Sequence, residues 1–159
     1  MAPNDRTGAK VSTLAGSCLC GEVRFSVSGP FPMLYQCHCS LCRKQGGSVS
    51  NTGLIVAVDK FRWISGEARI GQWQRSTGFR SHFCQVCGST VPNMLRDTGF
   101  VWVPAGALDD DGPLEIGAQL FLGSKMRCDW PRSDGLQYET APDLKVLIVI
   151  LHGERQGQQ

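Results

Sequence analysis

Apolar and polar positions alternate with a period of two over several parts of this chain. Between residues 16 and 29, Val23, Phe25 and Val27 alternate with polar residues. Alternation of this kind is typical of a strand that buries one face. A Gly-Pro dipeptide ends the pattern, so we expect residues 16–29 to form a β-hairpin.

Short apolar runs separated by turn residues continue along the rest of the chain. They predict strands, or arms of hairpins, at residues 54–58, 61–64, 69–75, 78–83, 100–103, 120–122 and 145–151. The cysteine-rich segment 34–47 has a turn-like composition, with one short helical turn expected near residues 41–45. No stretch holds a 3.6-residue apolar period for three turns. The pattern therefore predicts an all-β fold of short antiparallel sheets.

Length and composition favour one domain. The chain has 159 residues, of which 42% are hydrophobic and 19% charged, with 19 glycines and eight prolines suited to tight turns. We expect a flexible leader at residues 1–15, a single domain at residues 16–152 and a polar tail at residues 153–159. A net charge of +2 is small for a dedicated nucleic-acid binder, so no nucleic-acid partner is expected.

The sequence contains no segment typical of a membrane span or a secretion signal. The longest apolar run, residues 146–151, is much shorter than the ~18 residues of a spanning helix, and the N-terminal residues 1–10 are polar. We therefore expect a cytoplasmic protein with no membrane partner. Disulfides are rare in a reducing compartment, so the eight cysteines indicate metal binding.

Four of the cysteines predict a structural zinc site. Cys84 and Cys87 form a C-x-x-C motif followed by Gly88, and such a turn can supply two thiolates to one zinc ion. A structural zinc takes four ligands, and the C-x-C motif of Cys18 and Cys20 can supply the other two. A lone C-x-x-C motif also occurs in redox proteins, but the βαβ pattern that accompanies it there is missing.

Three further cysteines predict a different kind of site. Cys37, Cys39 and Cys42 can hold one metal ion and leave a fourth position open to water or substrate, as at a catalytic zinc. His38, between the first two cysteines, or the isolated Cys128 could instead close the site as a fourth ligand. Three free buried thiols are the plainer alternative, which the close spacing disfavours. We expect two zinc ions per chain.

The three cysteine motifs together resemble the glutathione-dependent formaldehyde-activating enzyme family, which includes centromere protein V. The matching segments are residues 16–23 (GSCLCGEV), 37–44 (CHCSLCRK) and 83–89 (FCQVCGS), followed by residues 106–109 (GALD), Ser124-Lys125 and Trp130. The resemblance runs from about residue 16 to about residue 138, in the order and spacing of the family. The chain departs from the family at Gln119, where many members carry a histidine, and at Cys128, where small residues or proline are common.

The resemblance implies both a fold and a reaction. Members have a β-rich fold related to zinc-binding β-tent domains, and residues 16–152 are expected to form one such domain. By resemblance, a structural zinc would be held by Cys18, Cys20, Cys84 and Cys87, and a catalytic zinc by Cys37, Cys39 and Cys42. Members are assigned as carbon–sulfur lyases that join glutathione and formaldehyde into S-hydroxymethylglutathione, or run the reverse. We therefore expect a zinc-dependent lyase acting on glutathione, or a similar thiol, and formaldehyde or another small aldehyde.

Two basic residues next to the second cysteine group are candidates for binding the carboxylates of glutathione. Arg43 and Lys44 directly follow Cys42, and the loop at residues 46–48 could add backbone amides. The alternative for this pair is that both side chains are solvated surface charges.

Two other functions are compatible with the same cysteines. A zinc-stabilised binding module without catalysis would close the second site with a fourth protein ligand. A redox or metal-storage protein would instead oxidise Cys37, Cys39 and Cys42 reversibly and release zinc. An open fourth position at the second group is therefore the feature that separates the lyase from the binding module.

Overall fold

Short strands make up most of the regular structure in residues 12–153, the part of the chain that the computed structural model describes. The strands are β1 (Thr13–Ser17), β2 (Arg24–Ser28), β3 (Leu34–Cys37), β4 (Asn51–Ala57), β5 (Phe61–Ser65), β6 (Ile70–Gln74), β7 (Arg80–Cys84), β8 (Thr90–Val91), β9 (Asn93–Met94), β10 (Phe100–Pro104), β11 (Ile116–Leu120) and β12 (Leu136–Gln137). The helices are α1 (Ser40–Gly46) and α2 (Leu144–His152), with 3₁₀ turns at η1 (Val58–Lys60), η2 (Glu67–Arg69), η3 (Ala105–Ala107) and η4 (Leu122–Ser124). The all-β class is confirmed.

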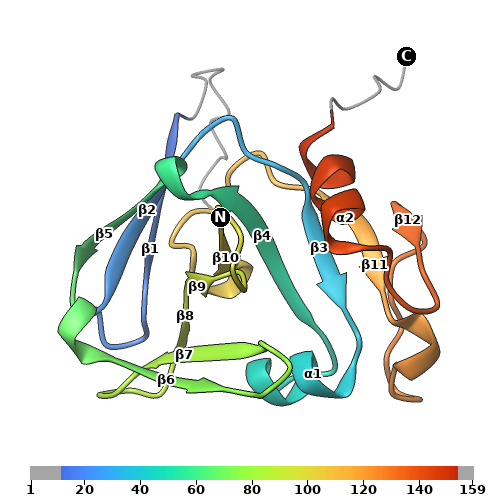
Figure 1. Cartoon of the computed structure of the whole chain (residues 1–159), viewed down its shortest axis with the longest axis horizontal. Helices are drawn as coiled ribbons and strands as arrows, with labels where there is room; N and C mark the ends of the chain where they lie inside the picture. The colour runs from blue at the N-terminus through green and yellow to red at the C-terminus, as the bar shows by residue number, and fades with distance from the viewer. Residues whose placement is uncertain (1–11, 154–159) are drawn as a thin grey trace, which may run out of the picture.

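The strands form three sheets, which lie along the three sides of a triangular outline in Figure 1. One sheet has the order β1-β2-β5, a second β6-β7-β8, and the third β12-β11-β3-β4-β10-β9. Most pairs are antiparallel, as expected, but β11 pairs in parallel with both β3 and β12. Two parallel strands need a long connection rather than a tight turn. The turn residues that mark hairpins in the sequence therefore do not indicate these two pairs.

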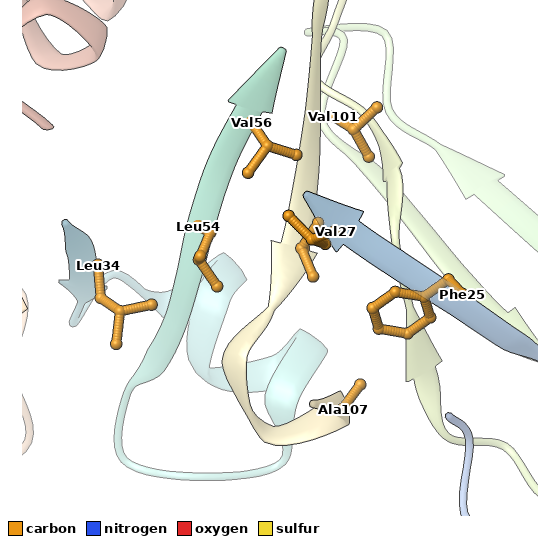
Figure 2. Packing of buried hydrophobic residues seen from close by; sticks show 8 residues of the cluster. Phe25, Val27, Leu34, Leu54, Val56, Val101 and Ala107 are labelled. Carbon is orange, nitrogen blue, oxygen red and sulfur yellow. The ribbon is translucent and has the colours of Figure 1, made fainter. Parts of the chain in front are cut away.

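The main hydrophobic core lies between the first sheet and one face of the six-stranded sheet. Phe25 and Val27 of β2 face Leu54 and Val56 of β4 (Figure 2). The remaining members of this buried cluster are Leu34, Val101, Val103 and Ala107. Alternation along β2 places its apolar residues on this side only, since successive strand residues point to opposite faces. The strand pattern in the sequence therefore already marks one wall of the core.

The opposite face of the six-stranded sheet is covered by α2, which lies beside β3 and β11 in Figure 1. The sequence predicted a strand at residues 145–151, and that prediction is wrong. Leu144, Leu147, Ile148 and Leu151 pack into the second core cluster, and this i, i+3, i+4, i+7 spacing is a helical stripe. Asp143 caps the helix, because its carboxylate accepts a hydrogen bond from the Lys145 N–H at 2.8 Å. Burial of this stripe outweighs the strand preference of the β-branched residues in the run.

Other strand predictions agree with the structure to different degrees. The predicted hairpins correspond to β1–β2 and β6–β7, and the predicted helical turn is the centre of α1. The strand expected at residues 120–122 lies earlier, as β11 ends at Leu120 and a 3₁₀ turn follows. β1 begins at Thr13, inside the range expected for the leader; residues 1–11 of that range, and residues 154–159 of the expected tail, lie outside the described residues. Within residues 12–153, no helix is long and apolar enough to cross a membrane.

Candidate metal centres

The first cysteine cluster joins the turn after β1 to the turn after β7. The Sγ atoms of Cys18 and Cys20 lie 3.5 Å apart, and those of Cys20 and Cys84 lie 3.8 Å apart. With Cys87 included, all four Sγ atoms lie within 4.8 Å of one another. A tetrahedral zinc with Zn–S bonds of about 2.3 Å requires sulfur separations of about 3.8 Å. The four thiols therefore fit a tetrahedral zinc ion.

Glycine shapes both turns of the first cluster. Gly21 and Gly88 have φ values of 78° and 76°, in the left-handed region that other residues resist. The N–H of Gly88 donates to the Cys84 carbonyl at 2.8 Å, and the N–H of Gly21 donates to the Cys18 carbonyl at 2.9 Å. These turns bring the two thiols of each motif to the same side of the backbone.

Further hydrogen bonds link the two turns and stabilise charge on the sulfurs. The Val23 N–H donates to Cys18 Sγ at 3.3 Å, and the Leu19 N–H donates to Ser89 Oγ at 3.0 Å. Ser89 Oγ also lies 3.2 Å from Cys87 Sγ, and hydrogen bonds with the side chain and the backbone of Ser89 are the main causes that lower the pKa of Cys87 to about 5. Ser89 thus holds the two halves of the cluster together.

The second cysteine cluster is built by the end of β3 and the start of α1. Cys37 is the last residue of β3, Cys39 is the N-cap of α1, and Cys42 lies in the first turn of that helix. Their Sγ atoms lie within 4.8 Å of one another. The Cys42 N–H points to Cys39 Sγ at 3.5 Å, so the short helix orients two of the three sulfurs.

The three thiols of the second cluster cannot all ionise easily without a cation. Hydrogen bonds from the thiols of Cys37 and Cys42 lower the pKa of Cys39 to about 2. The bond to Cys39 raises the pKa of Cys37 to about 11, and the bonds to Cys37 and Cys39 raise the pKa of Cys42 far above its usual range. A bound divalent metal removes this conflict, because coordination deprotonates thiols outright. The donor set therefore fits a metal ion.

His38 does not contribute a ring nitrogen to the second cluster. Its fully buried ring bonds Asp129 Oδ2 through Nδ1 at 2.5 Å and Gln119 Oε1 through Nε2 at 2.8 Å. Cys128 is exposed and lies outside both clusters. Among the described residues, the second cluster therefore has the three sulfurs of Cys37, Cys39 and Cys42 as its candidate ligand atoms.

A cavity of about 470 Å³ adjoins the second cluster and has all three cysteines in its wall. This volume lies within the range typical of small-molecule sites. The wall also contains polar and basic side chains that the sequence analysis did not single out for binding: Tyr35, Asn93, Trp102, Arg80 and Arg96. They come from four different strands and a loop, so no local motif marks them.

Arg43 and Lys44 lie outside the wall of this cavity. They line a separate depression of about 420 Å³ together with Ser48 and Met126. Two backbone carbonyl groups hold the Arg43 guanidinium in place, since it donates to the His38 carbonyl at 2.8 Å and to the Ser124 carbonyl. Their role as carboxylate ligands stays a prediction, and the cations in the wall of the cysteine-lined cavity are Arg80 and Arg96.

The fold and the two clusters define a small all-β protein with two cysteine groups that could hold metal ions. A family model described as glutathione-dependent formaldehyde-activating enzyme matches residues 13–124. The chain therefore belongs to the glutathione-dependent formaldehyde-activating enzyme family.

Two known proteins show how far the similarity extends. A Halomonas elongata protein, whose curated name carries a provisional assignment as a glutathione-dependent formaldehyde-activating enzyme, is 54% identical over 85 residues, covering 49% of this chain and 54% of that protein. The chain thus matches about half the length of this curated relative. The crystal structure of a Rhodobacter sphaeroides protein aligns with a TM-score of 0.52 at 24% identity, covering 62% of this chain and 91% of that one. This second similarity supports the fold alone.

Proposed function

We propose that this protein is a zinc-dependent carbon–sulfur lyase with two zinc ions per chain. It would join glutathione, or a similar thiol, with formaldehyde or another small aldehyde to give an S-hydroxymethyl adduct, or run the reverse. The observation that carries this proposal is the second cysteine cluster, which has three sulfurs and adjoins a cavity of about 470 Å³. Family membership supports the same chemistry.

The two clusters would have different roles in the lyase. Cys18, Cys20, Cys84 and Cys87 would hold a structural zinc, and Cys37, Cys39 and Cys42 would hold the catalytic zinc. When bound at the second cluster, zinc would supply a Lewis acid and promote ionisation of a substrate thiol. Three thiolates make a soft, electron-rich donor set, which suits a sulfur ligand from the substrate.

Tyr35 is the residue of this chain best placed to assist the aldehyde oxygen. In the reaction the thiol S–H adds across the C=O bond: an S–C bond forms, the carbonyl π pair moves to oxygen, and oxygen receives the proton. Tyr35 lies two residues before Cys37 on the same face of β3 and lines the same cavity. A tyrosine hydroxyl is neutral at pH 7 and can donate a hydrogen bond to the developing oxyanion.

Arg80 and Arg96 would receive the carboxylates of glutathione at the cavity wall. Arg80 is partly occupied, since it bonds the Arg96 carbonyl and Asp97 Oδ1, both at 3.0 Å. The exposed Arg96 makes one long hydrogen bond, from its guanidinium to the Thr77 carbonyl at 3.3 Å. Arg96 is therefore the freer of the two cations.

Zinc analysis combined with exchange spectroscopy tests this proposal. We expect two zinc ions per chain by elemental analysis, and faster exchange between free formaldehyde and S-hydroxymethylglutathione by NMR than in buffer. Cys128→Ser, which changes a cysteine outside both clusters, should behave like the wild type. Two zinc ions without faster exchange would favour the non-catalytic binding module. Reversible oxidation with zinc release would favour a redox protein.

A further inference from the structure

Two buried polar side chains in the cavity wall have an atom without a hydrogen-bond partner in the described chain. Asn93 is 6% exposed and Trp102 is 5% exposed, and both line the cavity next to the second cysteine cluster. Within residues 12–153, Asn93 Oδ1 and Trp102 Nε1 each lack a hydrogen-bond partner. A buried polar group without a partner loses its hydrogen bonds to water and gains none in return, so a ligand that bonds this pair would be favoured.

The two residues form one unit of the sheet. Asn93 of β9 and Trp102 of β10 lie directly opposite each other in an antiparallel pair, so their side chains lie on the same face. The orientation of the Asn93 amide follows from its surroundings. Its Nδ2 donates to the Met94 carbonyl at 2.9 Å, which leaves Oδ1 as the free acceptor. The pair thus presents one acceptor and one donor.

The indole nitrogen also lies toward the cysteine-lined part of the cavity. A Cβ atom added to Gly53 would lie 2.2 Å from Trp102 Nε1, so this nitrogen sits directly over the backbone of β4. Gly53 pairs with Tyr35 on β3, and Cys37 follows Tyr35 by two residues on the same face. Burial raises the pKa of Tyr35, and a side-chain contact with Trp102 acts in the opposite direction, so the Tyr35 hydroxyl lies near the indole. No hydrogen bond of good geometry joins Trp102 Nε1 to a partner among residues 12–153.

We propose that Asn93 and Trp102 are specificity-determining residues that select thiols flanked by amide groups. The N–H of one substrate amide donates to Asn93 Oδ1, and a substrate amide carbonyl accepts from Trp102 Nε1–H, while the thiol reaches the second cysteine cluster. A carboxylate can only accept hydrogen bonds, and a simple alkyl thiol supplies neither amide group. The substrate class is therefore a cysteine-containing peptide or acylated cysteine amide. This inference rests on the proposed function, since it places the thiol at the second cluster.

Binding of matched thiols to the zinc-loaded protein tests the pair. N-acetylcysteinamide carries amides on both sides of its cysteine and no carboxylate, so it separates the pair from any arginine. 2-Mercaptoethanol is the comparison thiol. We expect Trp102→Phe, which removes only the N–H donor and some ring area, to weaken N-acetylcysteinamide binding in calorimetry by ~5- to 10-fold, the effect of one lost hydrogen bond. Binding of 2-mercaptoethanol should change by less than about twofold.

Control variants separate recognition from folding. Trp63→Phe makes the same chemical change at the main core, away from this cavity, and should leave both dissociation constants unchanged. Gly53→Ala should lower affinity for N-acetylcysteinamide as Trp102→Phe does, because the added Cβ displaces the indole nitrogen. Asn93→Leu should have a similar selective effect.

The outcomes distinguish this inference from the proposed function. Equal weakening of both thiols by Trp102→Phe, or no weakening of either, would overturn the selection of amides. Selective weakening in a protein that does not accelerate the formaldehyde exchange would support the amide-binding pair and reject the lyase.

Discussion

The two cysteine clusters contain the same donor atom but differ in their surroundings. The first has four sulfurs, from two glycine-shaped turns that tie β1–β2 to β7–β8. The second has three sulfurs and borders a cavity whose wall is formed by residues of strands far apart in the sequence. Cysteine sulfurs can hold either a structural or a catalytic metal ion. The number of protein ligands and the space beside them determine which of the two roles a site can have. Five experiments test this distinction.

The largest expected effect follows from removing one of the four cysteines of the first cluster. Cys84→Ala removes a fully buried thiol of the first cluster and should lower the free energy of unfolding by about 4 kcal/mol or more, because a zinc ion held there would link two parts of the fold. Chemical denaturation followed by circular dichroism measures the change. Cys128→Ala is the matched control and should stay within about 0.5 kcal/mol. Unchanged stability of Cys84→Ala would remove the structural role.

Removing one cysteine from the second cluster should affect activity rather than folding. Cys39→Ser can retain the N-cap of α1, but serine is not among the usual zinc ligands. We expect the zinc content to fall from two to one and the formaldehyde exchange to slow by at least about 100-fold. Elemental analysis and NMR exchange measure the two quantities. A variant with one zinc and wild-type exchange would show that the second cluster is not catalytic.

A chelator should distinguish the two clusters in the unaltered protein. A zinc ion at the second cluster, which offers three sulfurs, should leave at least about tenfold faster than one at the first cluster, and saturating glutathione should slow its release. A colorimetric zinc indicator with a mild chelator follows both phases. A single phase that glutathione does not change would indicate two closed sites.

The role of Tyr35 gives a smaller and more specific effect. Tyr35→Phe keeps the ring and removes the hydroxyl, so kcat should fall by about 10-fold while KM for glutathione stays within about twofold. Tyr138→Phe is the matched control, since Tyr138 packs against the same core cluster but does not line the cavity. Equal effects of the two variants would indicate that Tyr35 acts only through packing.

The smallest expected effect concerns the carboxylates of glutathione. Arg96 has a φ of 52°, and asparagine tolerates this conformation, so Arg96→Asn tests the charge with little backbone strain. KM for glutathione should rise by about 3- to 5-fold, as expected of an exposed cation. Lys44→Ala should leave KM unchanged because Lys44 lines the other depression. A rise in KM for glutathione in Lys44→Ala, with no rise in Arg96→Asn, would instead support the predicted carboxylate site at Arg43 and Lys44.

The sequence predicted the cysteine groups correctly as spatial units, including the pairing of two motifs more than sixty residues apart. It also predicted the β-hairpins, because alternation has a local physical cause. It failed at α2, where β-branched residues suggested a strand. The signal in the sequence that indicates a helix there is the spacing of Leu144, Leu147, Ile148 and Leu151, preceded by the capping residue Asp143.

Local chemistry is readable in the sequence, because thiols brought together by one turn need only short spacings and a glycine. Cys37, Cys39 and Cys42 therefore stand out as a group by their spacing alone. Whether His38 could add a fourth ligand to that group depends on its hydrogen bonds. Its ring nitrogens bond Asp129 and Gln119, which come from remote segments of the chain. The cavity beside it likewise depends on the pairing of β9 with β10 and β4 with β3. Only the tertiary structure decides these features, since they arise from strand register and burial between residues that share no local pattern.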